Sequence, residues 1–185
     1  MNTVVTSREA ILKICRELVS QQGLAALNMR EVAQECHVAL GSLYNYFPSK
    51  NELLLATIES VWQDIFHLDQ PCGTALSFPA EVRRVFDSLQ TGMVAYPNFF
   101  TAHSIGFASG DKGRARQTME QYFHHMKGGL LEALQRDPAV RQDAFDENLT
   151  PSEFVEFVLS GLLSLLMQRK HSCAVLLEII RRSLY

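Results

Sequence analysis

Residues Asn28–Lys50, NMREVAQECHVALGSLYNYFPSK, place the strongest constraint on how this chain can fold. The stretch predicts a short helix, a tight turn and a second short helix that presents exposed tyrosines. This arrangement is a helix-turn-helix, whose second helix enters the major groove of DNA. We therefore expect the preceding residues to support this unit and the following residues to form a larger helical body.

Capping signals predict four helices in the front region. A T-x-x-E box at Thr6 opens the first helix, and Gly23 ends it because glycine accepts the left-handed conformation. Asn28 can cap the second helix, and Val38 is the apolar side chain expected between the second and third helices. The expected ranges of the first, third and fourth helices are 7–22, 39–46 and 49–68.

The remainder of the chain also reads as helical, because no stretch alternates with a period of two. The strongest start signal is Thr150-Pro151-Ser152-Glu153, and Gly128-Gly129 is expected to interrupt one long helix. The expected helices are 79–95, 98–108, 112–136, 154–169 and 172–184. The predicted fold class is all-α, with about nine helices. A three-helix helix-turn-helix domain over 1–50 and a connecting helix over 49–68 precede a larger helical domain over 69–185.

Charge gives only weak support for a nucleic-acid partner. The chain of 185 residues has a net charge of -3, divided into +1 for residues 1–50 and -4 for the rest. The front is thus less acidic than the back, but it carries no polybasic patch.

The cysteines and the hydropathy pattern indicate a soluble, cytoplasmic protein. Cys15, Cys36, Cys72 and Cys173 are widely spaced, with no secretory signal before them, so free thiols are expected rather than a disulfide or metal set. The longest uncharged apolar run, 157–167, is too short for a membrane span.

The last two helices are apolar on nearly every side, whereas a surface helix of a monomer needs only one apolar stripe. A homodimer interface explains such a second apolar face. The alternative is that both helices lie in the core of a single copy. The side chains predicted to form the interface are Val155, Leu159, Leu162, Leu163, Leu166, Leu176 and Ile180.

About 50 residues near the N-terminus resemble the tetracycline-repressor (TetR) family of bacterial transcription regulators. The resemblance is carried by Gly23, Asn28-Met29-Arg30-Glu31-Val32-Ala33, Val38, Gly41-Ser42-Leu43-Tyr44, Tyr46-Phe47 and Ser49-Lys50-Asn51-Glu52-Leu53. The chain departs from the family pattern at His37, where a turn glycine is usual, and at Ala39, where a capping serine is usual. Tyr46 and Asn51 replace a frequent histidine and glutamate.

The resemblance implies a dimer that binds double-stranded DNA at a near-palindromic operator, with half-sites about 34–36 Å apart or modestly more. Tyr44, Tyr46 and Lys50 are expected to contact phosphates, with rings also able to meet thymine methyls. Asn28 and Arg30 open the helix that crosses the DNA backbone. The third helix is the one expected to read the bases. The candidates for DNA contacts on it are Ala39 at its start and, for base edges, Leu40, Gly41, Ser42 and Asn45.

The resemblance also implies a small, apolar effector bound in the back domain, which would shift the connecting helix and release the DNA. Ordinary core packing is the alternative for each candidate pocket residue. The candidates are Phe86, Met93, Phe99, Phe100, His103, Phe107, Met119, Tyr122, Phe123 and Met126.

Two other classes of function remain in view. In the first, the helix-turn-helix binds DNA but the helical domain responds to a protein partner, or the protein activates transcription. Such a protein would need no closed ligand cavity. A small helical enzyme with a carboxylate-bridged metal site needs paired Glu-x-x-His motifs, which this sequence lacks. We therefore expect a ligand-responsive DNA-binding regulator, a repressor rather than an enzyme, with no cofactor, no metal and no catalytic residues.

Overall fold

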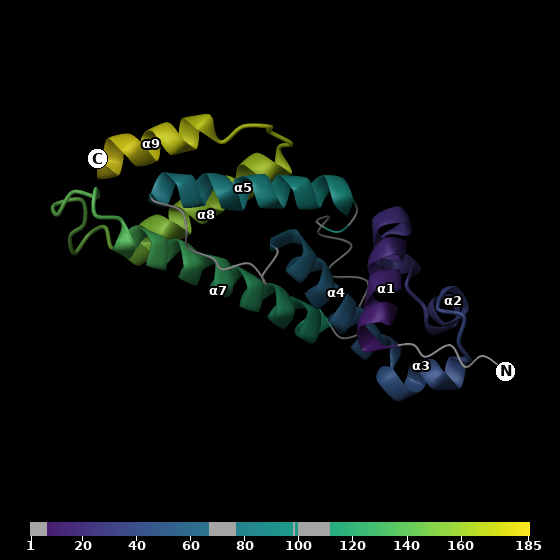
Figure 1. The fold of residues 1–185 in the computed structure, drawn as a ribbon. Helices are drawn as coiled ribbons and strands as arrows, with labels where there is room; N and C mark the ends of the chain where they lie inside the picture. Colours follow the sequence, from purple (N-terminus) through teal and green to yellow (C-terminus); the bar gives the residue numbers. More distant parts are fainter. Residues whose placement is uncertain (1–6, 67–76, 98, 100–111) are drawn as a thin grey trace. The chain divides into compact units, whose positions relative to one another are not determined.

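The computed structural model describes residues 7–66, 77–97, 99 and 112–185. Within these residues every regular element is helical, which confirms the all-α class (Figure 1). The chain divides into two compact units, residues 1–65 with 92–120 and residues 66–91 with 121–185. The domain boundary expected over residues 69–77, after the connecting helix, lies almost entirely outside the described residues and stays a prediction.

The first unit holds the helix-turn-helix. Its helices are α1 (Arg8–Gln22), the 3-10 turn η1 (Leu24–Ala26), α2 (Met29–Glu35), α3 (Leu40–Tyr46) and α4 (Lys50–Phe66). Their apolar faces form one core, because α1 contacts α2 and α2 contacts α3. Fully or almost fully buried side chains in this core include Ile11, Val19, Val32, Leu43, Phe47, Leu53, Ile58 and Trp62.

The start of α1 differs from the sequence prediction by one residue. Ser7 is the N-cap, since its side chain accepts a hydrogen bond of 3.1 Å from the amide of Ala10, so the predicted box at Thr6 is wrong. Either residue offers a hydroxyl, and the sequence pattern alone does not separate neighbouring hydroxyls as caps. The predicted end of the helix is confirmed at Gly23, where φ is 82° and the amide donates to the carbonyl of Val19.

The second unit contains α8 (Pro151–Met167), α9 (Ala174–Leu184) and parts of α5 (Phe78–Ala95) and α7 (Lys112–Arg136). The capping box predicted before α8 is confirmed, because Thr150 and Glu153 exchange hydrogen bonds. The predicted interruption at Gly128-Gly129 is wrong, since α7 runs through both glycines. The helix predicted over 98–108 lies almost entirely outside the described residues.

Asp137 joins three segments of the second unit. Its carboxylate is only 8% exposed and accepts hydrogen bonds from the Phe78 amide at 2.7 Å, the Ala139 amide at 3.0 Å and the Tyr185 hydroxyl. Burial raises the pKa of this carboxyl, but the hydrogen bonds from Tyr185, Phe78 and Ala139 outweigh burial and hold the pKa below its usual value. The ionised side chain therefore fixes the start of α5 beside the end of α9.

Candidate nucleic-acid interface

The reading helix α3 presents one face to the core of its unit and the other to solvent. Leu43 is buried within the helix and Phe47 at its C-cap, so these two side chains anchor it. Tyr44 and Tyr46 lie 44% and 38% exposed, and Asn45 between them is also exposed. The division follows from the helical period, because residues three or four apart share a face. The Tyr44 ring is thus available to a partner outside the chain, and the Tyr46 ring lies on the same exposed side of the unit.

The first turn of α3 carries few side-chain atoms and has no side-chain cap. Ala39 is the N-cap residue and offers no side-chain hydrogen bond, while Leu40 and Ser42 are partly exposed. A methyl group added at Gly41 would meet no atom of the chain within 4 Å. Nothing in the protein's own packing therefore requires glycine here, although glycine weakens a helix.

The turn between α2 and α3 contains a left-handed residue that is not glycine. His37 has a φ of 54°, and its amide donates to the carbonyl of Gln34 at 3.0 Å. The next amide, that of Val38, donates to Ala33 at 3.0 Å, and the Val38 side chain is half-buried as predicted for the residue between the helices. Histidine tolerates this conformation better than branched residues do, but at a cost that glycine would avoid.

Asn28 is occupied by its capping role. Its side-chain oxygen accepts from the Glu31 amide at 2.9 Å, and its side-chain nitrogen donates to the Glu31 carboxylate at 2.8 Å. This arrangement confirms the predicted cap. It leaves Asn28 less free to bind a phosphate than its neighbour Arg30, whose side chain is exposed.

Two cations flank the C-terminal end of α3. Lys50 is exposed in the first turn of α4, where Ser49 accepts a hydrogen bond of 3.2 Å from the Glu52 amide. The guanidinium of Arg8, at the start of α1, lies 5.3 Å from the centre of the Phe47 ring. Sequence reasoning did not select Arg8, because 39 residues separate it from Phe47 and only the fold brings it beside α3. The structure identifies Arg8 through its contact with Phe47, in which the cation lies over the aromatic ring of the C-cap residue.

The cations of the helix-turn-helix region are not neutralised by carboxylates. Among the described residues, none of the five takes part in an ion pair, whereas several cations of the second unit do. The five are Arg8, Lys13, Arg16, Arg30 and Lys50. Although the net charge of this region is small, carboxylates of the described residues thus do not neutralise its positive groups.

The predicted effector residues fall into three groups. Phe100, His103 and Phe107 lie outside the described residues, as does the side chain of Met119. Phe99 is fully buried and packs its ring against Trp62 in the first unit, where Met93 is partly exposed. In the second unit Phe86 and Met126 are buried, while Tyr122 and Phe123 are partly exposed. A shared effector cavity for these residues stays a prediction.

The predicted dimer residues lie mainly in the interior of one copy, the alternative that the sequence left open. Six of them are 0–8% exposed, and Leu163 is partly exposed: the six are Val155, Leu159, Leu162, Leu166, Leu176 and Ile180. These six have little surface left for a partner. The exposed apolar side chains of the same helices are Phe157, Met167, Val175 and Ile179, at 61%, 84%, 75% and 47%. Whether a second copy covers them stays a prediction.

The described cysteines are free thiols: Cys15 and Cys173 are buried and Cys36 is half-buried, while Cys72 lies outside the described residues. Burial raises the pKa of Cys15 to about 11, so this thiol is unreactive at neutral pH. Within the described residues no three potential metal-ligating side chains gather. None of the helices in that part of the chain has the length and hydropathy of a membrane span.

Comparison with known families identifies the same N-terminal region. Residues 11–57 match the model of the family described as bacterial regulatory proteins, tetR family. Over 58 residues the chain is 41% identical to the HTH-type transcriptional repressor KstR of Rhodococcus jostii, a match that covers 31% of this chain and 27% of the repressor. The chain thus matches about a quarter of the length of this relative.

Solved structures extend the likeness to the whole fold. The multidrug binding protein EbrR complexed with imidazole has a TM-score of 0.65 at 19% identity, over 98% of this chain and 96% of EbrR. BioQ with its double-stranded DNA operator has a TM-score of 0.54 at 16% identity, over 89% of this chain and 86% of BioQ. At these identities the likeness establishes the fold.

Proposed function

We propose, from the premise that this chain belongs to the tetR family of bacterial regulatory proteins, that it represses transcription by binding double-stranded DNA through α3. The observation that carries the proposal is the bare, exposed face of α3, which bears Tyr44, Asn45 and Tyr46 beside cations that lack carboxylate partners. The match to the tetR family spans residues 11–57, which include these residues of α3.

Phosphate contacts fix the position of the domain on DNA. Lys50 and Arg8 lie at the C-terminal end of α3, and Arg30 is exposed on α2, so the cations surround the reading helix. Tyr44 and Tyr46 add hydroxyl groups that can donate to phosphate oxygens. Arg8 extends the set of contacts predicted from the sequence.

Base recognition then falls to a short uncharged set of side chains. No lysine or arginine occurs within α3, so the frequent contact of arginine to guanine is not offered by this helix. Asn45 can pair with adenine, and Leu40 can meet the methyl group of thymine. The operator half-site is therefore expected to be rich in A·T pairs at the positions that α3 meets.

A homodimer would place two copies of α3 in successive major grooves, with half-site centres about 34–36 Å apart. The side chains that support the dimer are the exposed Phe157 and Met167 of α8 and Val175 and Ile179 of α9. Val175 and Ile179 lie one turn apart on α9 and so share a face, as expected for part of an interaction surface. A small apolar effector in the helical body would then change the spacing of the two heads, in keeping with the ligand-bound state of the similar structure EbrR.

The proposal is tested by selecting DNA fragments with the purified chain, sequencing them, and measuring the affinity for the selected fragment by fluorescence anisotropy at several salt concentrations. Lys50→Ala should lower the slope of log affinity against log salt by about one and weaken binding on all sequences. Lys170→Ala, an exposed cation in the second unit, is the matched control and should change neither quantity. An unchanged slope for Lys50→Ala would remove this lysine from the interface, and failure to enrich any fragment would refute DNA recognition.

A further inference from the structure

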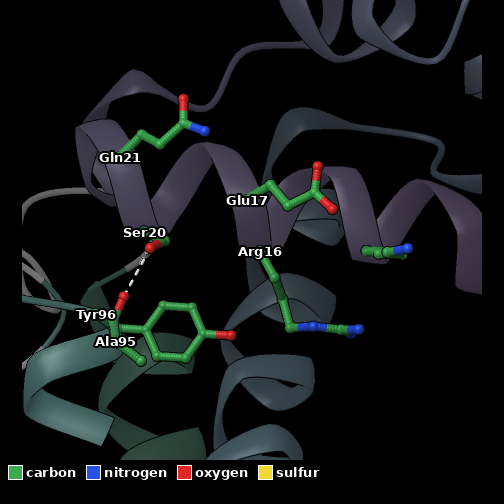
Figure 2. Close-up of a pocket in the computed structure, with 7 residues that line it drawn as sticks. Arg16, Glu17, Ser20, Gln21, Ala95 and Tyr96 are labelled. Carbon is green, nitrogen blue, oxygen red and sulfur yellow. Dashed lines mark hydrogen bonds between the residues drawn. The ribbon is translucent and has the colours of Figure 1, made fainter.

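An open pocket lies beside α1 in the first unit, away from the exposed face of α3. It has a volume of about 340 Å³ and is lined by Lys13, Arg16, Glu17, Ser20, Gln21, Ala95 and Tyr96. Figure 2 shows Ser20 directed from α1 towards Ala95 at the end of α5, and the Arg16 side chain on the same side of α1 with its guanidinium turned away from Ala95. The Ser20 hydroxyl donates to the Ala95 carbonyl at 2.7 Å and so holds the two walls together. None of the residues assigned above to DNA or to an apolar effector lines this pocket.

The polar groups of the walls leave hydrogen-bond donors unused. Arg16 donates to the Ser60 hydroxyl of α4 and also hydrogen-bonds the Tyr96 hydroxyl, but a guanidinium carries five N–H groups, so further donors remain. The Tyr96 hydroxyl is committed to the Asp64 carboxylate at 2.7 Å, and burial followed by this hydrogen bond raises the pKa of Tyr96, so the phenol stays neutral. Arg16 is held in place on one side while its remaining donors stay available.

The charge of the lining favours an anion. Lys13 and Arg16 lie three residues apart on α1 and therefore on one face of the helix. Neither forms an ion pair within the described residues, and Glu17 is the one carboxylate in the lining. Figure 2 shows the Glu17 side chain turned to the opposite side of α1 from Arg16. A planar guanidinium with free donors beside an ammonium group suits a carboxylate or a phosphate.

We propose that this pocket binds a small oxyanion, a carboxylate or phosphate group, through Arg16 and Lys13. The site is distinct from the reading helix and from the apolar effector cavity predicted in the helical body. It has a direct connection to α4, because the guanidinium that would hold the anion also bonds to Ser60. An anion in the pocket competes with Ser60 for the donors of Arg16.

The connection to α4 supplies a spectroscopic readout. Trp62 is the single tryptophan of the chain, and it lies in α4 between Ser60 and Asp64. Its side chain is 1% exposed and contacts Phe99 edge to face, with ring centres 5.5 Å apart. Rearrangement of Ser60 or Asp64 should therefore change the emission of Trp62.

The experiment titrates the full chain with sodium phosphate and, separately, with sodium succinate, each against sodium chloride at equal ionic strength. Trp62 emission and isothermal calorimetry are both recorded. The wild-type chain should show a saturable response to at least one oxyanion, and the two titrations distinguish phosphate from carboxylate. Lys13→Gln should weaken the apparent affinity about 2- to 5-fold, as for an exposed charge contact. Arg16→Gln should weaken it about 10-fold or more.

Controls separate a local site from general attraction to positive charge. Lys170→Gln removes an exposed cation outside the pocket that has no assigned role in DNA binding, and it should leave the affinity unchanged. Glu17→Gln should raise the affinity, because it removes the like charge from the lining. Lys13→Gln keeps the test valid if Arg16→Gln fails to fold. Equal affinities for the Lys13→Gln, Lys170→Gln and wild-type chains would overturn the proposal, as would the absence of a saturable response. The test uses no DNA, so its outcome is independent of the proposed repressor function.

Discussion

Replacing Gly41 with alanine should stabilise the protein and weaken its binding to DNA. Gly41 is the second residue of α3, and a methyl group at this position would meet no atom of the chain within 4 Å. Glycine in a helix costs about 0.5–1 kcal/mol relative to alanine, because its backbone loses more freedom on folding. Without a steric penalty to oppose it, the free energy of unfolding of Gly41→Ala should rise by about that amount.

The effect on DNA has the opposite sign if the first turn of α3 lies against the duplex. A methyl group forced into a close-packed contact costs about 1–3 kcal/mol. That range corresponds to a loss of affinity of about 5- to 150-fold. The gain in stability and the loss in binding come from the same atom, so the two measurements together distinguish an interface residue from a residue that supports the fold.

Gly128→Ala provides the matched control. Gly128 also lies within a helix, α7, and an added methyl group there would also meet no atom within 4 Å. This variant should gain about 0.5–1 kcal/mol of stability with no change in DNA affinity. Urea denaturation measures the free energy of unfolding, and fluorescence anisotropy with the selected DNA fragment measures the affinity. If Gly41→Ala binds DNA as tightly as the wild-type chain, the first turn of α3 does not approach the duplex and the proposed docking is refuted.

Three further predictions follow from the structure. His37→Gly should raise the free energy of unfolding by about 0.5–1 kcal/mol in urea denaturation, because φ at this residue is 54°, and a decrease would contradict the strain. The pKa of Asp137 is lower in the folded chain than its ordinary value of 3.8, so the ionised carboxylate stabilises the fold. This contribution is complete at pH values above 3.8 and is lost as the pH falls from there through the folded pKa. Asp137→Asn should therefore be less stable than wild type at neutral pH and lose less on acidification, and parallel pH profiles would remove Asp137 as the cause. Phe157→Asp with Ile179→Asp should give folded monomers in sedimentation velocity, whereas Val94→Asp, exposed in the first unit, should leave a dimer intact.

The helices of the first unit could be predicted closely because local signals determine them. Gly23 requires a left-handed turn, Asn28 caps α2, and the apolar side chains at Leu43 and Phe47 repeat with the helical period. Each signal acts within one or two turns, so the sequence contains all the information needed. The same reasoning selected Tyr44 and Tyr46, because a helix with one buried face must expose the other.

Contacts between distant residues could not be predicted in the same way. Arg8 reaches Phe47, and Arg16 reaches Ser60, only because the helices cross at particular positions. Both arginines lie on the polar side of α1. The hydrophobic period of the sequence predicts that such side chains are exposed, but it does not predict which distant residue each one contacts. The pocket beside α1 was missed for this reason.

The apolar tail shows why periodicity also fails to assign an interface. In α8 the polar residues Glu153, Glu156, Ser160 and Ser164 recur at helical spacing and are exposed, but the apolar Phe157 and Met167 lie on the same side and obscure this polar face in the sequence. The pattern also does not say towards which helix the opposite face is directed. The structure supplies that direction: a methyl group at Gly161 would lie 3.4 Å from Leu176 of α9, so this side of α8 packs within the copy. Val158 and Leu162 are then completely buried, and Phe157 and Met167 remain outside. Charges at Leu162 or Leu166 would consequently unfold the copy, whereas a charge at Phe157 tests the association of two copies without disturbing its core.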